Sequence, residues 1–381
     1  MKQLLEVVFC TDGIFPHAIG GMQRHSRLLI EELAKDPAIS LIVIHPHAGK
    51  QVFDGNAGIR EIAIDQGKSS GYYLADCYSY SKEIFKTISS YPDAVIYSQG
   101  LSVWHRIGDV RGRVIINPHG LEPYQAISVK DRIITAPFRF VFGFLFRKSA
   151  FVVSLGGRLT GILQNLVHPD KNKIRVLANA VNINPPVNRS FDSMPVKFLF
   201  VGRFASNKGI DILLQAIVQL NAEGYENKMF FNLVGKGPLY EEYRGVYKAS
   251  NIFFAGFADD EQLVGFYREN DVFVLPTLFE GMPTVVLEAM SYSMPVIVTD
   301  VGATLELVDD KNGFVIEKSD VKSLKNALLR YFNMSAVERK SLSDRSYLKV
   351  KDNFTWPVVA EKYKQLFRQV KSAVNSLPLE K

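Results

Sequence analysis

The sequence has little cysteine, with only Cys10 and Cys77 among 381 residues. Two thiols cannot form a disulfide framework or a zinc cluster, and this indicates a reducing compartment. The sequence also lacks any run of 18 uncharged apolar residues, so we expect no membrane-spanning helix. The opening segment, MKQLLEVVFCTDG, is too short and too acidic for a signal peptide and is typical of a buried first strand. These absences favour a cytoplasmic protein.

Several ligand-binding motifs are missing as well. There is no GxxxxGK[ST] phosphate loop, and no GxGxxG that would indicate a dinucleotide cofactor. No Asp-x-Asp motif stands out, and the histidines show no metal-ligand spacing with acidic or cysteine partners. We therefore expect no required metal ion and no cofactor.

The composition is that of a globular protein, with 47% hydrophobic and 22% charged residues. The formal charge of +6 arises entirely in residues 1–185, which hold 21 basic and 15 acidic residues against 24 of each in the remainder. A basic first half suits an anionic membrane surface or an anionic substrate, or is simply a mildly basic solvated surface. No dense basic run or recognition helix is present, so we expect no nucleic-acid partner.

Short Val/Ile/Phe-rich runs alternate with longer amphipathic stretches along the whole chain. This alternation predicts parallel sheets with helices on both faces. The expected strands are residues 4–9, 40–45, 94–99, 113–118, 151–155, 173–178, 196–202, 229–235, 251–256, 271–276 and 295–300. A proline-rich segment, 182–195, separates two halves. We expect a domain at 1–187, a second at 196–355 and a terminal amphipathic helix at 356–376.

The most informative segment is LPTLFEGMPTVVLEAMSYSMPVIVTD, residues 275–300. Glu280 follows a predicted strand, Pro283 suits the first turn of a helix, and Glu288 falls in the second turn. A helix start invites an anion, and a carboxylate accepts two hydrogen bonds from a diol. A ligand with diols at both ends and an anion between them is a nucleotide sugar. The alternative is an ordinary capping residue and a solvated helix residue.

Three further junctions follow predicted strands. In FVGRFASNKG, Arg203 and Lys208 supply two cations that suit a diphosphate. Gly20 and Gly21 open the first helix and let backbone approach a phosphate. His119, after VIINP, is expected at the carboxyl edge of its sheet, where it can hold or move a proton near neutral pH. Solvated loops, a tight turn and a satisfied turn histidine are the structural alternatives.

These segments in this order resemble the retaining glycosyltransferases of family 4, the glycosyl transferases group 1. EGMPTVVLE, GRFASNKG and IGGMQRHSRLLIEEL carry the resemblance, which covers nearly the whole chain and is strongest over 196–320. It implies the GT-B fold: two Rossmann-like doubly wound domains facing a central cleft, with the terminal helix crossing back to the first. This sequence departs from the family's pattern at two places. LANAVNI stands where PNGVD is commoner, so the resemblance does not decide whether Asn179 contacts the ligand. Lys236 stands in the GxGP turn where an acidic residue is more usual.

The resemblance also implies a role for each site residue. Arg203 and Lys208 would bind the diphosphate, Glu280 the donor sugar, and Glu288 the ribose. The other implied contacts are His119 near the transferred sugar, Gly20 and Gly21 near the phosphate, Gly256 near the base, and backbone at Gly281, Met282, Pro283 and Thr284.

The charges predict a metal-independent reaction with retention of configuration. Fixed cations would stabilise the departing diphosphate, and no carboxylate nucleophile is assignable. The expected function is transfer from a UDP- or GDP-sugar to a glycan or lipid-linked acceptor in cell-surface polysaccharide biosynthesis, with peripheral contact to the inner face of an anionic membrane. The alternatives are a nucleotide-sugar epimerase of the same architecture and a non-catalytic nucleotide-sugar or glycan-binding module.

Overall fold

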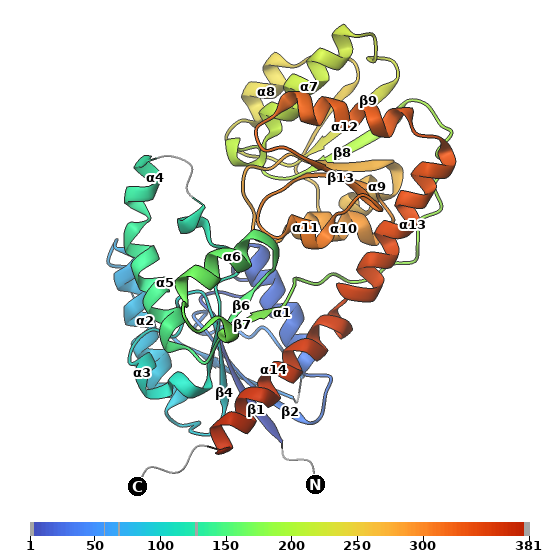
Figure 1. The fold of residues 1–381 in the computed structure, drawn as a ribbon. Coiled ribbons are helices and arrows are strands. Elements are labelled where there is room, and N and C mark those ends of the chain that lie inside the picture. Colours follow the sequence, from blue (N-terminus) through green and yellow to red (C-terminus); the bar gives the residue numbers. More distant parts are fainter. Residues whose placement is uncertain (1–3, 57, 68, 126–128, 377–381) are drawn as a thin grey trace. The chain divides into compact units, whose positions relative to one another are not determined.

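The chain forms two compact units, one comprising Met1–Asn179 with Trp356–Lys381 (unit 1) and the other Ala180–Thr355 (unit 2). The structure is a computed structural model that describes residues 4–56, 58–67, 69–125 and 129–376 (Figure 1). All pairings between the described strands are parallel, as expected for runs of apolar residues buried on both faces.

Unit 1 contains a seven-stranded sheet in the order β3-β2-β1-β4-β5-β6-β7. Its strands are β1 Leu5–Cys10, β2 Ile39–His45, β3 Ile59–Ala63, β4 Val95–Gln99, β5 Val114–Asn117, β6 Phe151–Ser154 and β7 Ile174–Val176. Its helices are α1 Gly21–Leu33, α2 Tyr73–Ile88, α3 Ile107–Val110, α4 Val129–Ile134, α5 Ala136–Lys148, α6 Gly157–Leu166 and α14 Trp356–Ser376, with 3-10 turns η1 Arg111–Arg113, η2 Glu122–Tyr124 and η3 Lys171–Lys173.

Unit 2 contains a six-stranded sheet in the order β10-β9-β8-β11-β12-β13. Its strands are β8 Val196–Val201, β9 Met229–Val234, β10 Ile252–Gly256, β11 Val272–Leu275, β12 Val296–Thr299 and β13 Gly313–Ile316. Its helices are α7 Ile210–Ala222, α8 Tyr240–Val246, α9 Asp260–Glu269, α10 Thr284–Ser291, α11 Thr304–Leu307, α12 Val321–Asn333 and α13 Ala336–Asn353, with the 3-10 turn η4 Ser206–Lys208. In Figure 1, α7 and α12 lie on one side of this sheet and α10 and α11 on the other.

The terminal helix α14 packs within unit 1, against α1, β1 and β4. The apolar residues expected on one face of it are all buried: Val359, Tyr363, Leu366, Phe367 and Val370. The helical spacing of these residues therefore identified the correct packing face. The predicted α/β architecture, with a final helix that returns to the first unit, is confirmed.

Two edge strands were missing from the sequence prediction. β3 (IREIA) carries two charged side chains in five residues, and β13 (GFVI) begins with glycine. Both lie at sheet edges, where a strand has one hydrogen-bonded neighbour and needs less apolar content. Apolar periodicity alone does not reveal such strands.

The proline-rich segment 182–195, expected to separate the domains, belongs to unit 2. Arg189 anchors it, because its guanidinium donates to backbone carbonyls of Tyr267, Asn270, Tyr292 and Ser293. The one guanidinium thus binds the C-terminal ends of both α9 and α10. The first compact unit has its internal boundary at Asn179, and the expected domain bound at residue 187 stays a prediction.

Each sheet has one point where the strand order reverses. It lies between β1 and β4 in unit 1, and between β8 and β11 in unit 2. Loops that leave the carboxyl ends of two such neighbouring strands run to opposite faces of the sheet and leave a crevice, where ligands of doubly wound folds bind. Ligand-binding residues are therefore expected directly after β1, β4, β8 and β11.

Candidate functional site

In unit 2 the loops after β8 and β11 bring Lys208 and Glu280 into direct contact. Lys208 Nζ donates to Glu280 Oε1, and the two side chains are 24% and 15% exposed. Thr277 stabilises the same corner, since its hydroxyl donates to the carbonyls of Asn207 at 3.0 Å and Phe279 at 3.2 Å. An ammonium has three donors, so the contact with Glu280 leaves Lys208 able to bind a further acceptor.

Glycine lets these loops pack backbone against backbone. Gly209 has φ 66°, and a Cβ there would lie 1.9 Å from the carbonyl oxygen of Pro276. Gly302, after β12, has φ 55°, and its Cβ would lie 2.2 Å from the carbonyl oxygen of Glu280. No other residue type fits either position without moving the loop. The loop that carries Glu280 is thus held by close backbone contacts with Gly209 in the loop after β8 and with Gly302 in the loop after β12.

Glu288 lies on α10 and accepts a hydrogen bond from Tyr267 on α9, with 2.9 Å between Oη and Oε2. Burial and the adjacent charge of Glu288 raise the pKa of Tyr267 well above its ordinary value, so the phenol remains a donor. Tyr267 orients the carboxylate, a role that the sequence analysis missed. The available signal was an aromatic residue on the buried side of the amphipathic helix α9.

The start of α10 differs slightly from the sequence prediction. Pro283 is the N-cap residue and the helix begins at Thr284, whereas Pro283 was expected in the first turn. Proline has no side-chain acceptor, so it does not cap the first N–H groups of the helix. Met282 and Pro283 are buried beneath this helix start, and Glu288 falls in the second turn as predicted.

Arg203 and Lys236 lie in the loops after β8 and β9, and Gly256 ends β10 at the same carboxyl edge of the sheet. Arg203 and Lys236 are exposed, and the side chain of Arg203 makes no hydrogen bond or ion pair with the residues that the structure describes. Gly235 and Gly256 are joined by a 2.7 Å backbone hydrogen bond, and Gly256 has φ 74°. Unit 2 therefore joins Lys208 to Glu280 and places Arg203, Lys236 and Gly256 at the same edge of its sheet.

In unit 1, His119 follows β5 with φ 56° and is partly buried, and its backbone N–H donates to Asn117 Oδ1 at 2.8 Å. The His25 and His119 rings lie 5.0 Å apart, edge to face. Burial lowers the pKa of His25 to about 4, and that of His119 well below its ordinary value. Both imidazoles are therefore neutral at neutral pH. The lowered pKa of His119 favours the neutral imidazole, and the proton-transfer role expected of this residue stays a prediction.

Gly20 and Gly21 are exposed where α1 begins. Gly20 is extended at the N-cap, and α1 starts at Gly21, around which a Cβ would meet nothing within 4 Å. The backbone at this helix start is exposed, and its expected contact with a phosphate stays a prediction. Among residues 4–56, 58–67, 69–125 and 129–376, no group of three or more His, Cys, Asp or Glu is arranged to hold a metal ion.

The charged edge of unit 2 lies within a segment that matches a known family. Residues 195–334 match the family model described as Glycosyl transferases group 1. Over these residues the chain is similar to the group 1 glycosyl transferases. The match contains Arg203, Lys208, Glu280 and Glu288, so the resemblance that the sequence motifs indicated is confirmed where it was expected to be strongest.

Curated proteins similar to this chain include two that are named as glycosyltransferases. The UDP-Gal:alpha-D-GlcNAc-diphosphoundecaprenol alpha-1,3-galactosyltransferase of Escherichia coli is 24% identical over 266 residues, covering 65% of this chain and 68% of the relative. The capsular polysaccharide biosynthesis glycosyltransferase CapM of Staphylococcus aureus is 27% identical over 172 residues, or 44% of each chain. The chain spans 66% and 63% of two further relatives from Salmonella typhimurium and Escherichia coli, less than two thirds of their length.

Among solved structures, sucrose-phosphate synthase from Thermosynechococcus elongatus has a TM-score of 0.77 and 20% identity, covering 97% of this chain and 100% of that one. At this identity the likeness shows the fold alone. The group 1 segment and the sheet that precedes it therefore form a GT-B fold, as predicted.

Proposed function

We propose that the protein is a retaining glycosyltransferase that moves a sugar from a UDP- or GDP-sugar to a glycan or lipid-linked acceptor in cell-surface polysaccharide biosynthesis. The observation that carries this proposal is the contact of Lys208 with Glu280 at the carboxyl edge of unit 2, in the loop that leads to the helix start of α10, which has no side-chain cap. The names of the relatives support it, since one transfers from UDP-Gal to a diphosphoundecaprenol-linked acceptor.

The donor would lie along the loops after β8 to β12. Arg203 and Lys208 would bind the diphosphate, the backbone from Gly281 to Thr284 would donate to phosphate or sugar oxygens, and Glu280 would accept from sugar hydroxyls. Glu288, held by Tyr267, would accept from the two ribose hydroxyls. The base would contact backbone near Gly256. In unit 1, Gly20, Gly21 and His119 keep their predicted roles near the phosphate and the transferred sugar, with His119 as a neutral hydrogen-bonding group.

The chemistry follows from where charge develops. Cleavage of the sugar–phosphate bond places positive charge on the sugar and negative charge on the leaving diphosphate, which fixed cations stabilise. The leaving phosphate would accept the acceptor's proton on the same face, so the configuration is retained. We propose that this step needs no metal ion, because Arg203 and Lys208 supply the countercharge.

The first test is donor binding followed by transfer. The full chain is screened with UDP, GDP and ADP by thermal shift, and then with the matching sugars and a glycan acceptor. The proposal expects stabilisation by one nucleoside diphosphate, and a product whose anomeric configuration by NMR equals that of the donor, in the presence of EDTA. A sugar altered without an acceptor would identify the epimerase alternative. Binding without any turnover would identify a non-catalytic module.

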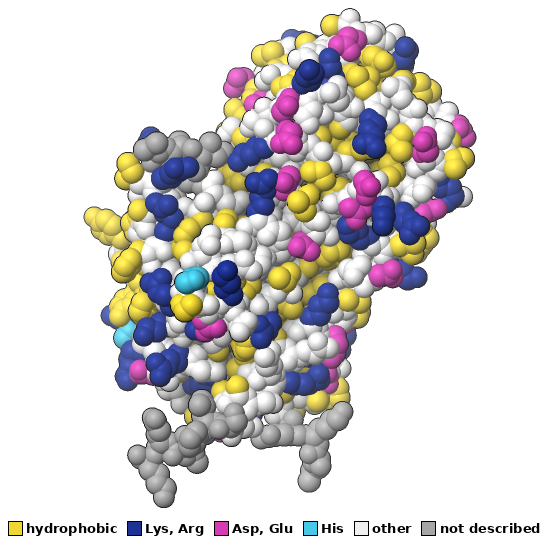
Figure 2. Space-filling view, in the orientation of Figure 1, with side chains coloured by type: hydrophobic (Ala, Val, Ile, Leu, Met, Phe, Trp, Pro, Cys, Tyr) yellow, Lys and Arg dark blue, Asp and Glu magenta, His cyan; other side chains and the backbone are white. Residues whose placement is uncertain are grey.

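We further propose that unit 1 contacts an anionic membrane on its cytoplasmic face through α4 and α5. Phe140 is 76% and Ile133 70% exposed there, next to Ile134. The same two helices carry the basic residues Lys130, Arg132, Arg139, Arg147 and Lys148. Figure 2 shows apolar and basic side chains next to one another on the part of unit 1 formed by α2, α4 and α5. Among the described residues no helix combines the length and apolar content needed to cross a bilayer.

Liposome flotation at low salt tests this membrane contact. The full chain should float with vesicles containing phosphatidylglycerol and remain unbound to neutral vesicles, because each basic residue near an anionic surface contributes about 1 kcal/mol. Phe140→Ser should reduce flotation, and Phe257→Ser, which changes an equally exposed aromatic in unit 2, should not. Equal flotation of both variants, or none of the wild type, would contradict the contact.

A further inference from the structure

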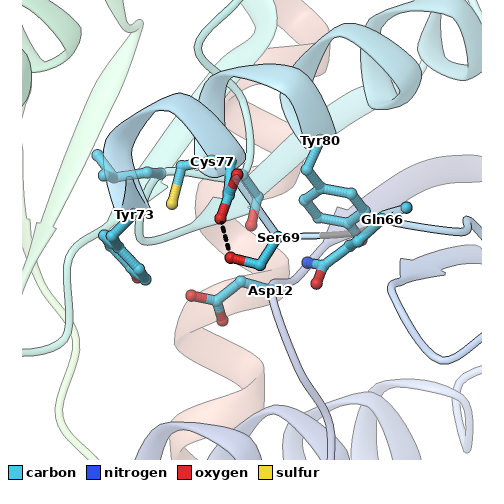
Figure 3. A pocket seen from close by; sticks show the side chains of 10 residues that line it. Asp12, Gln66, Ser69, Tyr73, Cys77 and Tyr80 are labelled. Atoms are coloured by element: carbon cyan, nitrogen blue, oxygen red, sulfur yellow. Dashed lines mark hydrogen bonds between the residues drawn. The ribbon is translucent and has the colours of Figure 1, made fainter. Parts of the chain in front are cut away.

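Unit 1 has buried polar atoms without hydrogen-bond partners in two surroundings. One is a pocket of about 250 Å³ between the loops after β1 and β4, lined in part by Asp12, whose Oδ1 has no partner among the described residues (Figure 3). The other is a group of rings from α1, the loop after β5 and the start of α14, formed by His25, His119 and Trp356. We refer to these three side chains as the ring cluster. The proposed mechanism uses only His119 of this cluster.

His25 lies at the centre of the ring cluster. Its ring centroid is 5.0 Å from that of His119, in an edge-to-face arrangement, and 5.3 Å from that of Trp356. His25 and Trp356 are only 3% and 4% exposed, so neither offers a surface to a ligand. His119 is partly exposed. Any effect of His25 on a bound ligand therefore acts through His119.

The ring cluster holds four buried nitrogens that have no hydrogen-bond partner among the described residues. They are Nδ1 and Nε2 of His25, Nε2 of His119 and Nε1 of Trp356. Buried polar atoms without a partner are costly, and native proteins contain few of them. Their concentration on three neighbouring rings therefore needs a common explanation. A buried water that bonds to two to four such atoms is the usual one.

The chemistry of the three rings gives each bond its direction. The indole N–H of Trp356 can only donate, so a water beside it accepts from it. The same water has two hydrogens, which it can donate to one nitrogen of His25 and to Nε2 of His119. Burial lowers the pKa of both imidazoles, so each ring is neutral, with one nitrogen protonated and the other able to accept. An accepting Nε2 leaves the proton of His119 on Nδ1, because the hydrogen bond at one ring nitrogen decides which nitrogen is protonated.

We propose that His25 and Trp356 are positioning residues which, through one shared buried water, hold His119 in the tautomer that has its proton on Nδ1. Nδ1 of His119 is not among the buried atoms without a partner, so it is the nitrogen that can face a ligand. His119 then presents an N–H, rather than a bare nitrogen, to an oxygen of the transferred sugar or the phosphate. This last step rests on the proposed glycosyltransferase function. The tautomer itself does not, so the two claims can be tested separately.

Nitrogen NMR of the full chain, labelled with ¹⁵N in histidine and tryptophan, reads the tautomer without any ligand. Protonated and bare ring nitrogens resonate far apart, and the signals of His119 are assigned by their loss in His119→Asn. The wild type at neutral pH should show one neutral tautomer of His119, with the proton on Nδ1. The chain has two tryptophans, so the indole N–H of Trp356 is readily assigned, and it should show an NOE to a long-lived water.

Matched substitutions separate hydrogen bonding from packing. His25→Phe keeps a buried aromatic ring but removes both nitrogens, so His119 should become a mixture of tautomers. His25→Gln loses the ring but keeps an amide that can bond to the water, so the Nδ1–H tautomer should persist. A role in packing alone predicts the reverse. Trp356→Phe removes the indole N–H and should act like His25→Phe, which keeps the test available if one of the two variants does not fold. The control is His105→Phe, at a partly buried histidine that bonds to Tyr78, and it should leave the tautomer unchanged.

The transfer assay then measures the consequence of the tautomer. His25→Phe should lower kcat/KM about 5-fold, as expected when one oriented hydrogen bond is made only part of the time. Normal kcat/KM despite a changed tautomer would overturn the step toward the sugar. A proton on Nε2 in the wild type, an unchanged tautomer in both His25→Phe and Trp356→Phe, or loss of the tautomer in His25→Gln alone would each overturn the proposal. The expected tautomers in a chain that transfers no sugar would retain the positioning role of His25 and remove the proposed function.

Discussion

The two units share one topology but present opposite chemistry at the point where their strand order reverses. In unit 2 the loops after β8 and β11 carry an ion pair, an exposed arginine and an uncapped helix start. In unit 1 the loops after β1 and β4 enclose tyrosine and leucine side chains around a single unsatisfied carboxylate. The sheet fixes where a ligand binds, and the loop residues decide which ligand it is. An anionic ligand fits unit 2 and is disfavoured beside the Asp12 carboxylate of unit 1.

The largest loss of turnover is expected for a change at Arg203 in unit 2. Arg203→Ala should lower turnover on the order of 10²–10³-fold, because a fixed cation that stabilises the departing diphosphate is removed. Steady-state kinetics with a saturating donor measures this loss. Arg244→Ala, an exposed arginine on α8 of the same unit, is the matched control and should retain normal turnover. A near-normal rate for Arg203→Ala would remove that residue from the mechanism.

A second prediction separates binding from transfer at Glu280. Glu280→Gln keeps the side-chain shape but removes the charge that pairs with Lys208. Transfer should fall by roughly 10²-fold, because the neutral amide of glutamine accepts hydrogen bonds from the sugar hydroxyls more weakly than the carboxylate does, at the point where charge develops in the transition state. Nucleoside diphosphate affinity, measured by calorimetry, should change little. Equal loss of affinity and turnover would instead assign Glu280 to holding the loops together.

A third prediction concerns the stability of unit 1. The pKa of Asp12 is raised from 3.8 to about 6 in the folded chain, so folding favours the protonated form. Its contribution to stability is therefore full below pH 4 and is lost as the pH rises to 6. Asp12→Asn should stabilise the chain at pH 7.5 by about 2 kcal/mol and flatten the stability profile between pH 4 and 6. Urea unfolding at several pH values measures both, and an unchanged profile would show that Asp12 is well solvated.

The smallest effect on activity is expected for Tyr267, which positions Glu288 in unit 2. Tyr267→Phe removes the hydrogen bond to Glu288, which should weaken nucleotide binding about 5-fold, equivalent to about 1 kcal/mol. Because Glu288 is assigned to the ribose, KM for the donor should rise while kcat is nearly unchanged. Tyr243→Phe on α8 is the matched control. A fall in kcat with normal KM would place Glu288 closer to the reacting bond.

Much of unit 2 was predictable because its function lies in contiguous segments. EGMPTVVLE places Glu280 and Glu288 around one helix start, and GRFASNKG places Arg203 and Lys208 after one strand, so local rules suffice. The direct contact of Lys208 with Glu280 was not predicted. It depends on β8 and β11 being neighbours, which the sequence order does not reveal.

Side-chain contacts in unit 1 were harder to predict, because they too depend on which distant segments become neighbours in the fold. Its pocket joins Asp12, Cys77 and Ser102 from three separate segments, and no spacing rule connects them. His119 was placed correctly after a strand, but its burial against His25 and its lowered pKa arise from packing by α1 and not from its own segment. Local sequence indicates which residue types follow each strand. It does not indicate how deeply each side chain is buried.

The central claim is that the charged edge of unit 2 binds a nucleoside diphosphate. Calorimetry of the full chain with UDP and GDP, repeated for Lys208→Ala and for the control Lys228→Ala, tests it most directly. The account predicts binding of one of the two diphosphates by the wild type and the control, and at least about 10-fold weaker binding by Lys208→Ala. Absence of binding to either diphosphate, or equal affinity in all three proteins, would contradict it.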